Sequence, residues 1–312
     1  MDSYQMLEDF PEQFKAVDVP SLEIDHDGFV FSGMGGSGIV GDFMRLFLKV
    51  DKPILSIKGY ELPSFVKKSW LLVCTSYSGN TEETISILEE SLRRGLEPLC
   101  VSSGGALQEI SKERGLLHLP LPHGYPPRYA LGFMFSTLLS LFGMGGEVEK
   151  IREHLKEHKE EIKSEAKSIA KNLFGYLPVV YGTPLTESVA FRWKTQINEN
   201  SKTLCYNAFL PEMHHNEVVG LDNPSIRSLC HFILLKDAED HPRIARRVTI
   251  TEEVFKELGI VLKLLQGKGS TLIERLMYLT YLGDWVSFYL AELYQQDPVP
   301  VKVIDYIKKN LI

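Results

Sequence analysis

A buried strand that runs directly into a loop of small hydroxyl residues constrains the fold of this chain more than any other feature. The run from Trp70 to Cys74 is apolar throughout, as is typical of a strand buried in a parallel sheet. Thr-Ser-Tyr-Ser-Gly-Asn-Thr follows at 75–81, and a helical pattern then opens with Ile85, Leu88 and Leu92 on one face. This order predicts a strand–loop–helix unit with the loop at the carboxyl end of the strand.

The loop has the chemistry of an anion site. Ser76, Ser78 and Thr81 lie where unpaired helix amides and the helix dipole both favour negative charge. Because the loop lacks lysine, it is not a Walker-type nucleotide loop, and its neutral hydroxyl groups suit a sugar phosphate monoester. The alternative is an ordinary capped helix, since Ser, Thr and Asn are common helix caps.

A glycine-rich loop, Gly33–Gly38, follows an earlier strand and fits the dinucleotide pattern G-x-G-x-x-G. That interpretation needs an acidic residue at the end of the second strand, but 54–57 leads into Lys58, and Glu61 comes too late. The glycines are better explained by close approach of the backbone to a small ligand, with Ser37 donating a hydrogen bond. A tight turn with close helix–sheet packing is the alternative.

Strands and helices alternate in both halves, which predicts two doubly wound parallel sheets in three-layer αβα subdomains with extra helices. We expect a first domain at 1–146, a connecting helix at 147–175 and a second domain at 176–312. The predicted strands are 29–32, 54–57, 70–74, 98–101, 116–119, 179–181, 231–235 and 260–265, and the predicted helices are 38–50, 81–94, 106–114, 131–142, 147–171, 187–200, 252–258 and 271–294.

Composition excludes several classes of protein. A formal net charge of −7 argues against nonspecific binding to nucleic acid. Apolar stretches are too short to span a membrane, and the start of the chain lacks a signal-peptide pattern. The four cysteines are widely spaced and form no C-x-x-C pair, so we expect reduced thiols, no metal site and a cytoplasmic protein.

Two segments carry groups that can transfer protons. Glu199 stands between Asn198 and Asn200 at a predicted helix end, where it is either a solvated side chain or a general base held by the flanking amides. His214 and His215 lie in a polar loop and could shuttle protons. Metal binding is the minority interpretation of these two histidines, because no H-x-x-x-H or H-E-x-x-H spacing accompanies them.

Two cations complete the set of candidates. Arg128 follows two prolines on a stiff turn before a helix, which would aim a fixed positive charge, although surface arginines are common. Lys308 lies near the end of the chain, where lysines are ordinarily solvated.

Together these segments resemble the double-SIS (sugar isomerase) domain proteins, and among them the bifunctional phosphoglucose/phosphomannose isomerases. The glycine-rich loop and the hydroxyl loop are typical of SIS domains generally, whereas Asn-Glu-Asn and His-His-Asn are typical of this subfamily. The matching segments are 32–38, 76–84, 127–131, 198–200, 211–216 and 304–308.

The resemblance implies an aldose–ketose isomerase that interconverts glucose 6-phosphate, and possibly mannose 6-phosphate, with fructose 6-phosphate through a cis-enediol. Glu199 would move the proton between C2 and C1, Lys308 would assist at the ring oxygen, and Arg128 would stabilise the enediolate. His215 would assist ring opening from the neighbouring subunit, which implies a homodimer with shared active sites. The residues implied to hold the sugar phosphate are Gly36, Ser37, Ser76, Ser78 and Thr81.

This chemistry moves no hydride and, with Arg128 bearing the positive charge, needs neither metal nor cofactor. Dual-specificity relatives carry Thr seven residues before the C-terminal Lys, where this chain has Val301. This difference argues against the mannose 6-phosphate activity more than against the glucose 6-phosphate activity. Two alternatives stay open. One is a catalytically silent SIS module that senses sugar phosphates, against which Glu199 and His215 argue. The other is an NAD(P)-binding dehydrogenase, which lacks its acidic partner.

Overall fold

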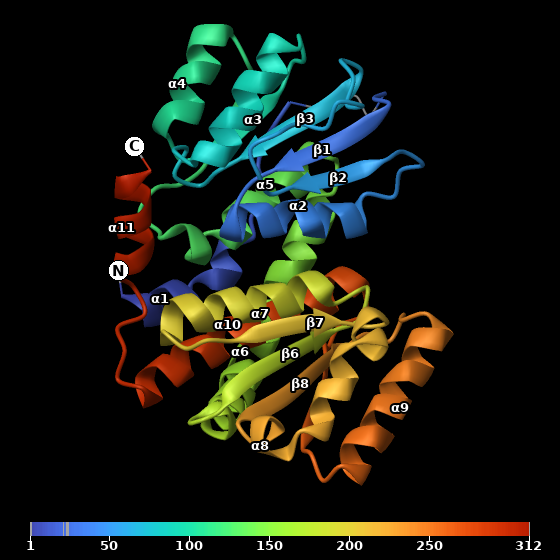
Figure 1. Ribbon diagram of the computed structural model, residues 1–312. Coiled ribbons are helices and arrows are strands. Elements are labelled where there is room, and N and C mark those ends of the chain that lie inside the picture. The colour runs from blue at the N-terminus through green and yellow to red at the C-terminus, as the bar shows by residue number, and fades with distance from the viewer. Residues whose placement is uncertain (1, 21, 23–24, 312) are drawn as a thin grey trace. The chain divides into compact units, whose positions relative to one another are not determined.

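Two parallel sheets with helices on both faces form the core of the computed structural model, which describes residues 2–20, 22 and 25–311 (Figure 1). The chain divides into two compact units. The N-terminal unit is Glu8–Glu153, and the C-terminal unit is Met1–Leu7 with His154–Ile312. The helix α6, Gly145–Leu173, contains the division at 153/154. The fold class predicted from the sequence is confirmed.

The sheet of the N-terminal unit has the order β2-β1-β3-β4-β5, and all its strands are parallel. Because β1 lies between β2 and β3, the strand order reverses between β1 and β3. Ligands of open α/β sheets bind outside the carboxyl ends of the strands at such a point. The strands are β1 Gly28–Ser32, β2 Ile54–Ile57, β3 Trp70–Thr75, β4 Leu99–Ser102 and β5 His118–Pro120.

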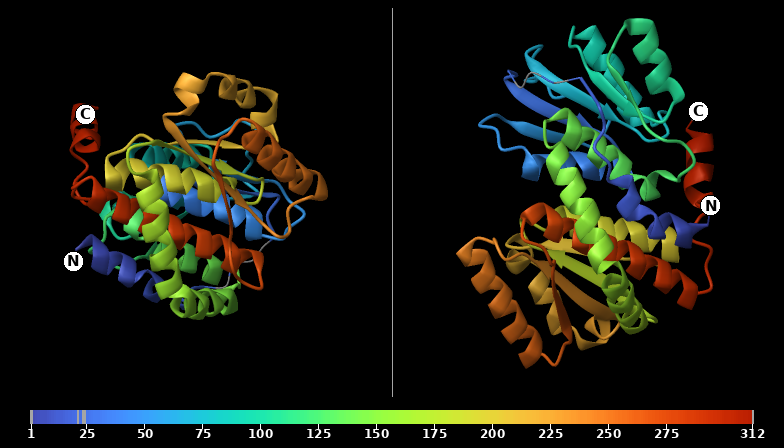
Figure 2. Two further views of the ribbon diagram at one scale, coloured as in Figure 1. Left: turned by 90° about the horizontal axis from the view of Figure 1, so that it is seen from below. Right: turned by 180° about the vertical axis from the view of Figure 1, so that it is seen from behind.

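Helices cover both faces of this sheet (Figure 1 and Figure 2). On one face Ile87 of α3 and Leu107 of α4 pack against Val30, Leu72 and Cys100 of the strands. The other face holds α2 and α5 over an aromatic layer that includes the pairs Phe31–Phe142 and Phe43–Phe135. The helices are α2 Gly35–Phe47, α3 Glu82–Arg93, α4 Gly105–Arg114 and α5 Leu131–Leu141.

The sheet of the C-terminal unit has the order β7-β6-β8-β9 and is also parallel. Its strands are β6 Leu177–Gly182, β7 Tyr206–Phe209, β8 Cys230–Lys236 and β9 Leu262–Gln266. Its main helices are α7 Glu187–Ser201, α9 Pro242–Glu257, α10 Leu272–Leu293 and α11 Lys302–Asn310. The short elements of the chain are α1 Ser3–Glu8, η1 Phe10–Gln13, η2 Pro127–Tyr129, η3 Glu212–His215, η4 Glu217–Asp222 and α8 Pro224–Arg227.

Strand β7 and the start of helix α9 differ from the sequence-based prediction, and helices α8 and α11 were not predicted. Strand β7 was missed because it is a short edge strand whose residues are exposed or half-buried and show no apolar alternation. Helix α9 begins at Pro242 and not at Glu252, because its first turns are rich in arginine and hide the apolar face that Ile244 and Val248 share with Phe255. Within the described residues, none of the helices has the length and apolar surface needed to cross a membrane.

Helices α7 and α10 pack tightly, and this contact fixes the position of α7. The indole of Trp193 donates to the carbonyl of Leu279 at 2.8 Å, and Gly283 leaves the space that the indole occupies. Next to it the buried guanidinium of Arg192 forms a bidentate pair with Asp284, with distances of 2.9 and 2.7 Å. The polar pair and the indole together set the register between the two helices.

Gly283→Ala is expected to lower the free energy of unfolding by about 1–3 kcal/mol, because the added methyl group would overlap the indole of Trp193. Gly146→Ala in α6 is the control, since its methyl group would meet nothing within 4 Å. Urea unfolding of both variants and the parent measures the effect. Equal urea midpoints for the two variants would contradict this prediction, because they would show that the helices can move apart to admit the methyl group without loss of stability.

Candidate functional site

The hydroxyl loop joins β3 to α3, and Thr81 is the residue that precedes the helix. Ser76 is buried: its Oγ lies 2.8 Å from Thr81 Oγ1 and accepts from the amide of Gly79 at 3.1 Å. Ser78 is exposed, and Thr81 is half-buried. Ser76 therefore holds the loop in shape, while Ser78 and Thr81 are the hydroxyl groups that an incoming anion can reach.

The loop after β4 supports the hydroxyl loop from the side. The amide of Ser103 donates to the carbonyl of Tyr77 at 2.8 Å. Gly79 has a φ of +73°, and a side chain there would also overlap the carbonyl of Gly104. Glycine is required at this position for both reasons, because it tolerates positive φ and permits the close contact.

The glycine-rich loop lies directly against the hydroxyl loop. Ser37, in the first turn of α2, accepts a hydrogen bond from the amide of Tyr77 at 3.1 Å, and its hydroxyl lies 3.3 Å from the sulfur of Met134. A Cβ at Gly36 would lie 3.2 Å from the carbonyl of Pro127, so the missing side chain lets the segment that carries Arg128 approach α2. The glycines thus bring three segments together at one sheet edge.

Arg128 is buried in the short helix η2, and its guanidinium carbon lies 5.1 Å from the centre of the Tyr129 ring. Gln13 holds this segment in place: its amide nitrogen donates to the carbonyl of Tyr129 at 2.6 Å, and its oxygen accepts from the amide of Gly132 at 3.0 Å. Sequence reasoning missed Gln13. The only signal was a glutamine between Phe10 and Phe14, which does not reveal a partner more than a hundred residues away.

The end of β2 does not favour a dinucleotide. Lys58 follows this strand directly, and its ammonium group pairs with Asp42 of α2. A ribose would need a carboxylate acceptor at this place. The charge on Lys58 is therefore opposite to the one that the free ribose hydroxyl of NAD needs.

The corresponding edge of the C-terminal sheet is filled by internal contacts. After β6, the hydroxyl of Thr186 is buried and donates to the carbonyl of Leu235 at 2.7 Å. After β8 comes an acidic loop, in which Asp237 accepts two hydrogen bonds of 2.8 Å from Arg275. Glu239 and Asp240 follow it. Carboxylates would repel a phosphate, so the hydroxyl chemistry for an anion belongs to the N-terminal sheet.

Glu199 lies in the last turn of α7 and is half-buried. The side chains on either side fix the end of this helix. Asn198 accepts from the amide of Cys205 at 2.8 Å, and Asn200 donates to the hydroxyl of Ser287 on α10 at 2.9 Å. These bonds anchor the backbone around Glu199 to the strand that follows and to the neighbouring helix.

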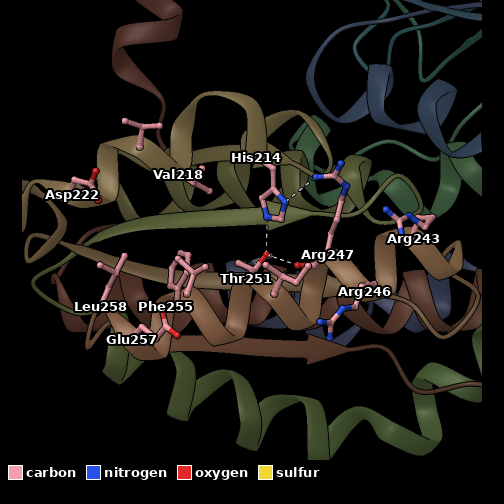
Figure 3. A pocket seen from close by; sticks show the side chains of 13 residues that line it. His214, Val218, Asp222, Arg243, Arg246, Arg247, Thr251, Phe255, Glu257 and Leu258 are labelled. Carbon is pink, nitrogen blue, oxygen red and sulfur yellow. Dashed lines mark hydrogen bonds between the residues drawn. The ribbon is translucent and has the colours of Figure 1, made fainter.

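The two adjacent histidines have different surroundings. His215 is exposed at the end of η3. The ring of His214 is half-buried and bonded on both sides: Arg247 donates to Nδ1 at 3.1 Å, and Nε2 lies 2.9 Å from the hydroxyl of Thr251 (Figure 3). Burial lowers the pKa of His214, and the charges of Arg247 and His215 lower it further. His214 is therefore a neutral anchor that fastens η3 to α9.

Lys308 is exposed on α11, and Val301 is the residue that precedes this helix. The structure therefore places the predicted residues in two sets. Gly36, Ser37, Ser76, Ser78, Thr81 and Arg128 lie on neighbouring segments of the N-terminal unit. Glu199, His215 and Lys308 belong to three separate elements of the C-terminal unit, α7, η3 and α11.

The described side chains hold no cluster of three or more His, Cys, Asp or Glu residues suited to a metal ion. His214 already uses both ring nitrogens within the protein.

Comparison with known proteins identifies the family. Residues 162–311 match the family described as the bacterial phospho-glucose isomerase C-terminal SIS domain. A bifunctional phosphoglucose/phosphomannose isomerase of Aquifex aeolicus is 48% identical over 99% of this chain and 98% of its own length. One from Caldicellulosiruptor bescii is 36% identical over 99% of this chain and 98% of its own.

Solved structures share the fold. A glucose-6-phosphate isomerase like protein from Thermus thermophilus superposes with a TM-score of 0.68 at 18% identity, over 99% of this chain and 95% of that one. Since its sequence has diverged so far, it supports the architecture alone. The Aquifex aeolicus relative, in contrast, is 48% identical over nearly the whole of both chains. The chain therefore belongs to the family of bifunctional phosphoglucose/phosphomannose isomerases.

Proposed function

We propose that the protein interconverts glucose 6-phosphate and mannose 6-phosphate with fructose 6-phosphate. The observation that carries this proposal is the hydroxyl loop, since Ser78 and Thr81 present accessible oxygens at the switch point of the sheet in a family of sugar-phosphate isomerases. Offering the two aldose phosphates separately in a coupled assay tests it. Formation of fructose 6-phosphate from both supports dual specificity, and formation from glucose 6-phosphate alone would assign the departure at Val301 a role in specificity.

The phosphate is proposed to bind the hydroxyl loop. Ser78 and Thr81 donate to its oxygens, and the first amides of α3 point toward it. Ser37 and Ser76 act through the loop, because their hydroxyl groups bond Tyr77, Gly79 and Thr81. Gly36 keeps the backbone clear on the glycine-loop side.

Isomerisation then needs a base, a ring-opening group and a fixed positive charge. Glu199 takes the proton from C2 of the open sugar and returns it to C1, and the hydroxyl proton of O2 passes to O1, so the carboxylate is regenerated. Arg128 stabilises the negative oxygen of the enediolate and, as a buried side chain, is already in place before the charge develops. His215 and Lys308 exchange the protons that open and close the ring. The cycle transfers no electrons to an acceptor, so it calls for no redox cofactor.

The proposal includes a homodimer in which His215 serves the active site of the other subunit. The ring of His215 is exposed, whereas its neighbour His214 is fastened to α9. A side chain presented to solvent from an anchored segment is available to a second chain. A silent sugar-phosphate sensor, the alternative class, would need the hydroxyl loop but neither Glu199 nor His215.

Glu199→Gln is expected to lower the turnover number at least ~10²-fold, because the amide cannot accept the proton from C2. Binding of fructose 6-phosphate should stay nearly unchanged, since the shape of the side chain is kept. Steady-state kinetics and calorimetry measure the two quantities. Glu187→Gln, in the first turn of the same helix, is the matched control. Turnover near the parent value in Glu199→Gln would remove Glu199 from the mechanism.

Mixed dimers test the shared site. Glu199→Gln and His215→Ala chains, unfolded and refolded together in equal amounts, should recover about a quarter of the parent activity, because half the dimers are mixed and each has one intact site. Refolded separately, each variant should stay inactive, which provides the control. If the mixture also stays inactive, the two residues act within one chain.

A further inference from the structure

A cavity of about 600 Å³ lies between α9 and the segment formed by η3 and η4 in the C-terminal unit (Figure 3). This volume is that of a small-molecule site. None of its lining residues belongs to the set assigned to the sugar phosphate. They are His214, Val218, Val219, Asp222, Arg243, Arg246, Arg247, Ile250, Thr251, Val254, Phe255, Glu257 and Leu258.

Positive charge is concentrated at one end of this cavity. Arg243 and Arg247 stand four residues apart on α9, so their side chains lie on the same face of the helix. Arg246 has a carboxylate within 4 Å, that of Glu253. Among the residues described by the structure, no carboxylate pairs with Arg243 or Arg247. Two like charges at this spacing repel each other, and an anion bound between them would relieve that repulsion.

The guanidinium of Arg247 has donors that remain available to a ligand. Its Nη1 donates to Nδ1 of His214, which is a neutral acceptor and brings no negative charge (Figure 3). Since a guanidinium has five N–H donors in a planar fork, the remaining donors of Arg247 can bind a planar or tetrahedral oxyanion. Arg243 lies at the same end of the cavity in Figure 3 and is exposed.

Beyond the two arginines, the cavity is lined first by apolar side chains and then, at its far end, by acidic ones. Val218, Phe255 and Leu258 lie beyond His214, and Asp222 and Glu257 lie at the end away from Arg243 and Arg247 (Figure 3). An anion is therefore attracted to one end and repelled from the other. An apolar body attached to it would cover the side chains in the middle.

We propose that this pocket binds a small organic oxyanion, a phosphate monoester or a carboxylate with an apolar body, whose charged group lies against Arg243 and Arg247. The ligand's apolar part lies over Val218 and Phe255. Binding supplies the counter-charge that the two arginines lack, and it occurs one residue away from His215, on the segment that His214 fastens to α9.

The test follows the ring signals of His214 by NMR while phenyl phosphate, benzoate or inorganic phosphate is added to the full-length protein. His214→Gln identifies the signal. Because His215 is proposed to reach the sugar-phosphate site of the other subunit, the titration is repeated in Thr81→Ala, in which a shift caused by a ligand at the hydroxyl loop should weaken and a shift caused by a ligand in this pocket should not. We expect phenyl phosphate, benzoate or both to shift the signal saturably and at lower concentration than inorganic phosphate. Comparing the affinities of phenyl phosphate and benzoate shows whether the pocket prefers a phosphate ester or a carboxylate.

Arg243→Glu is the decisive variant, because Arg243 makes no bond to His214 and its loss leaves the anchor of η3 intact. Its affinity for the bound probe should fall at least about tenfold, as expected for a lost charge-assisted hydrogen bond. The control is Lys256→Gln with Lys263→Gln, which lowers the net charge by the same two units outside the lining residues. No saturable shift with either organic probe, an equal affinity in Arg243→Glu, or equal binding of inorganic phosphate would overturn the proposal.

Discussion

One hydrogen bond, from the amide of Tyr77 to the hydroxyl of Ser37 at 3.1 Å, joins the two loops on which the candidate site depends. It crosses the switch point between β1 and β3, where the strand order reverses. Because the donor is a backbone amide, the bond fixes the path of the hydroxyl loop and not merely one side chain. Ser76 then closes the loop internally through its bonds to Gly79 and Thr81, which leaves Ser78 exposed and Thr81 half-buried.

The two units repeat one architecture but differ at this edge of the sheet. In the N-terminal unit small residues and hydroxyl groups occupy it, whereas the C-terminal unit has a buried threonine and an acidic loop, two of whose carboxylates pair with Arg275. In the proposed mechanism the loops of the first sheet bind the phosphate, and the second unit presents Glu199 and His215 from anchored segments.

Much of this could be predicted from the sequence, because strong local patterns determine it. The apolar strand before the hydroxyl loop, the bounds of β2 at Ile54–Ile57 and the parallel alternation all follow from short-range signals. What could not be predicted depends on distant contacts. Gln13 supports the Arg128 segment across more than a hundred residues, and His214 differs from His215 only through its partners on α9.

The central claim is that Ser78 and Thr81 hold the phosphate. Calorimetric binding of glucitol 6-phosphate tests it most directly, because this analogue has the phosphate but no carbonyl and cannot react. Ser78→Ala and Thr81→Ala should each weaken binding by about 1.5–3 kcal/mol, or roughly tenfold to a hundredfold, while Thr249→Ala, exposed on α9, leaves it unchanged. Affinities in both loop variants equal to that of the parent would contradict the account.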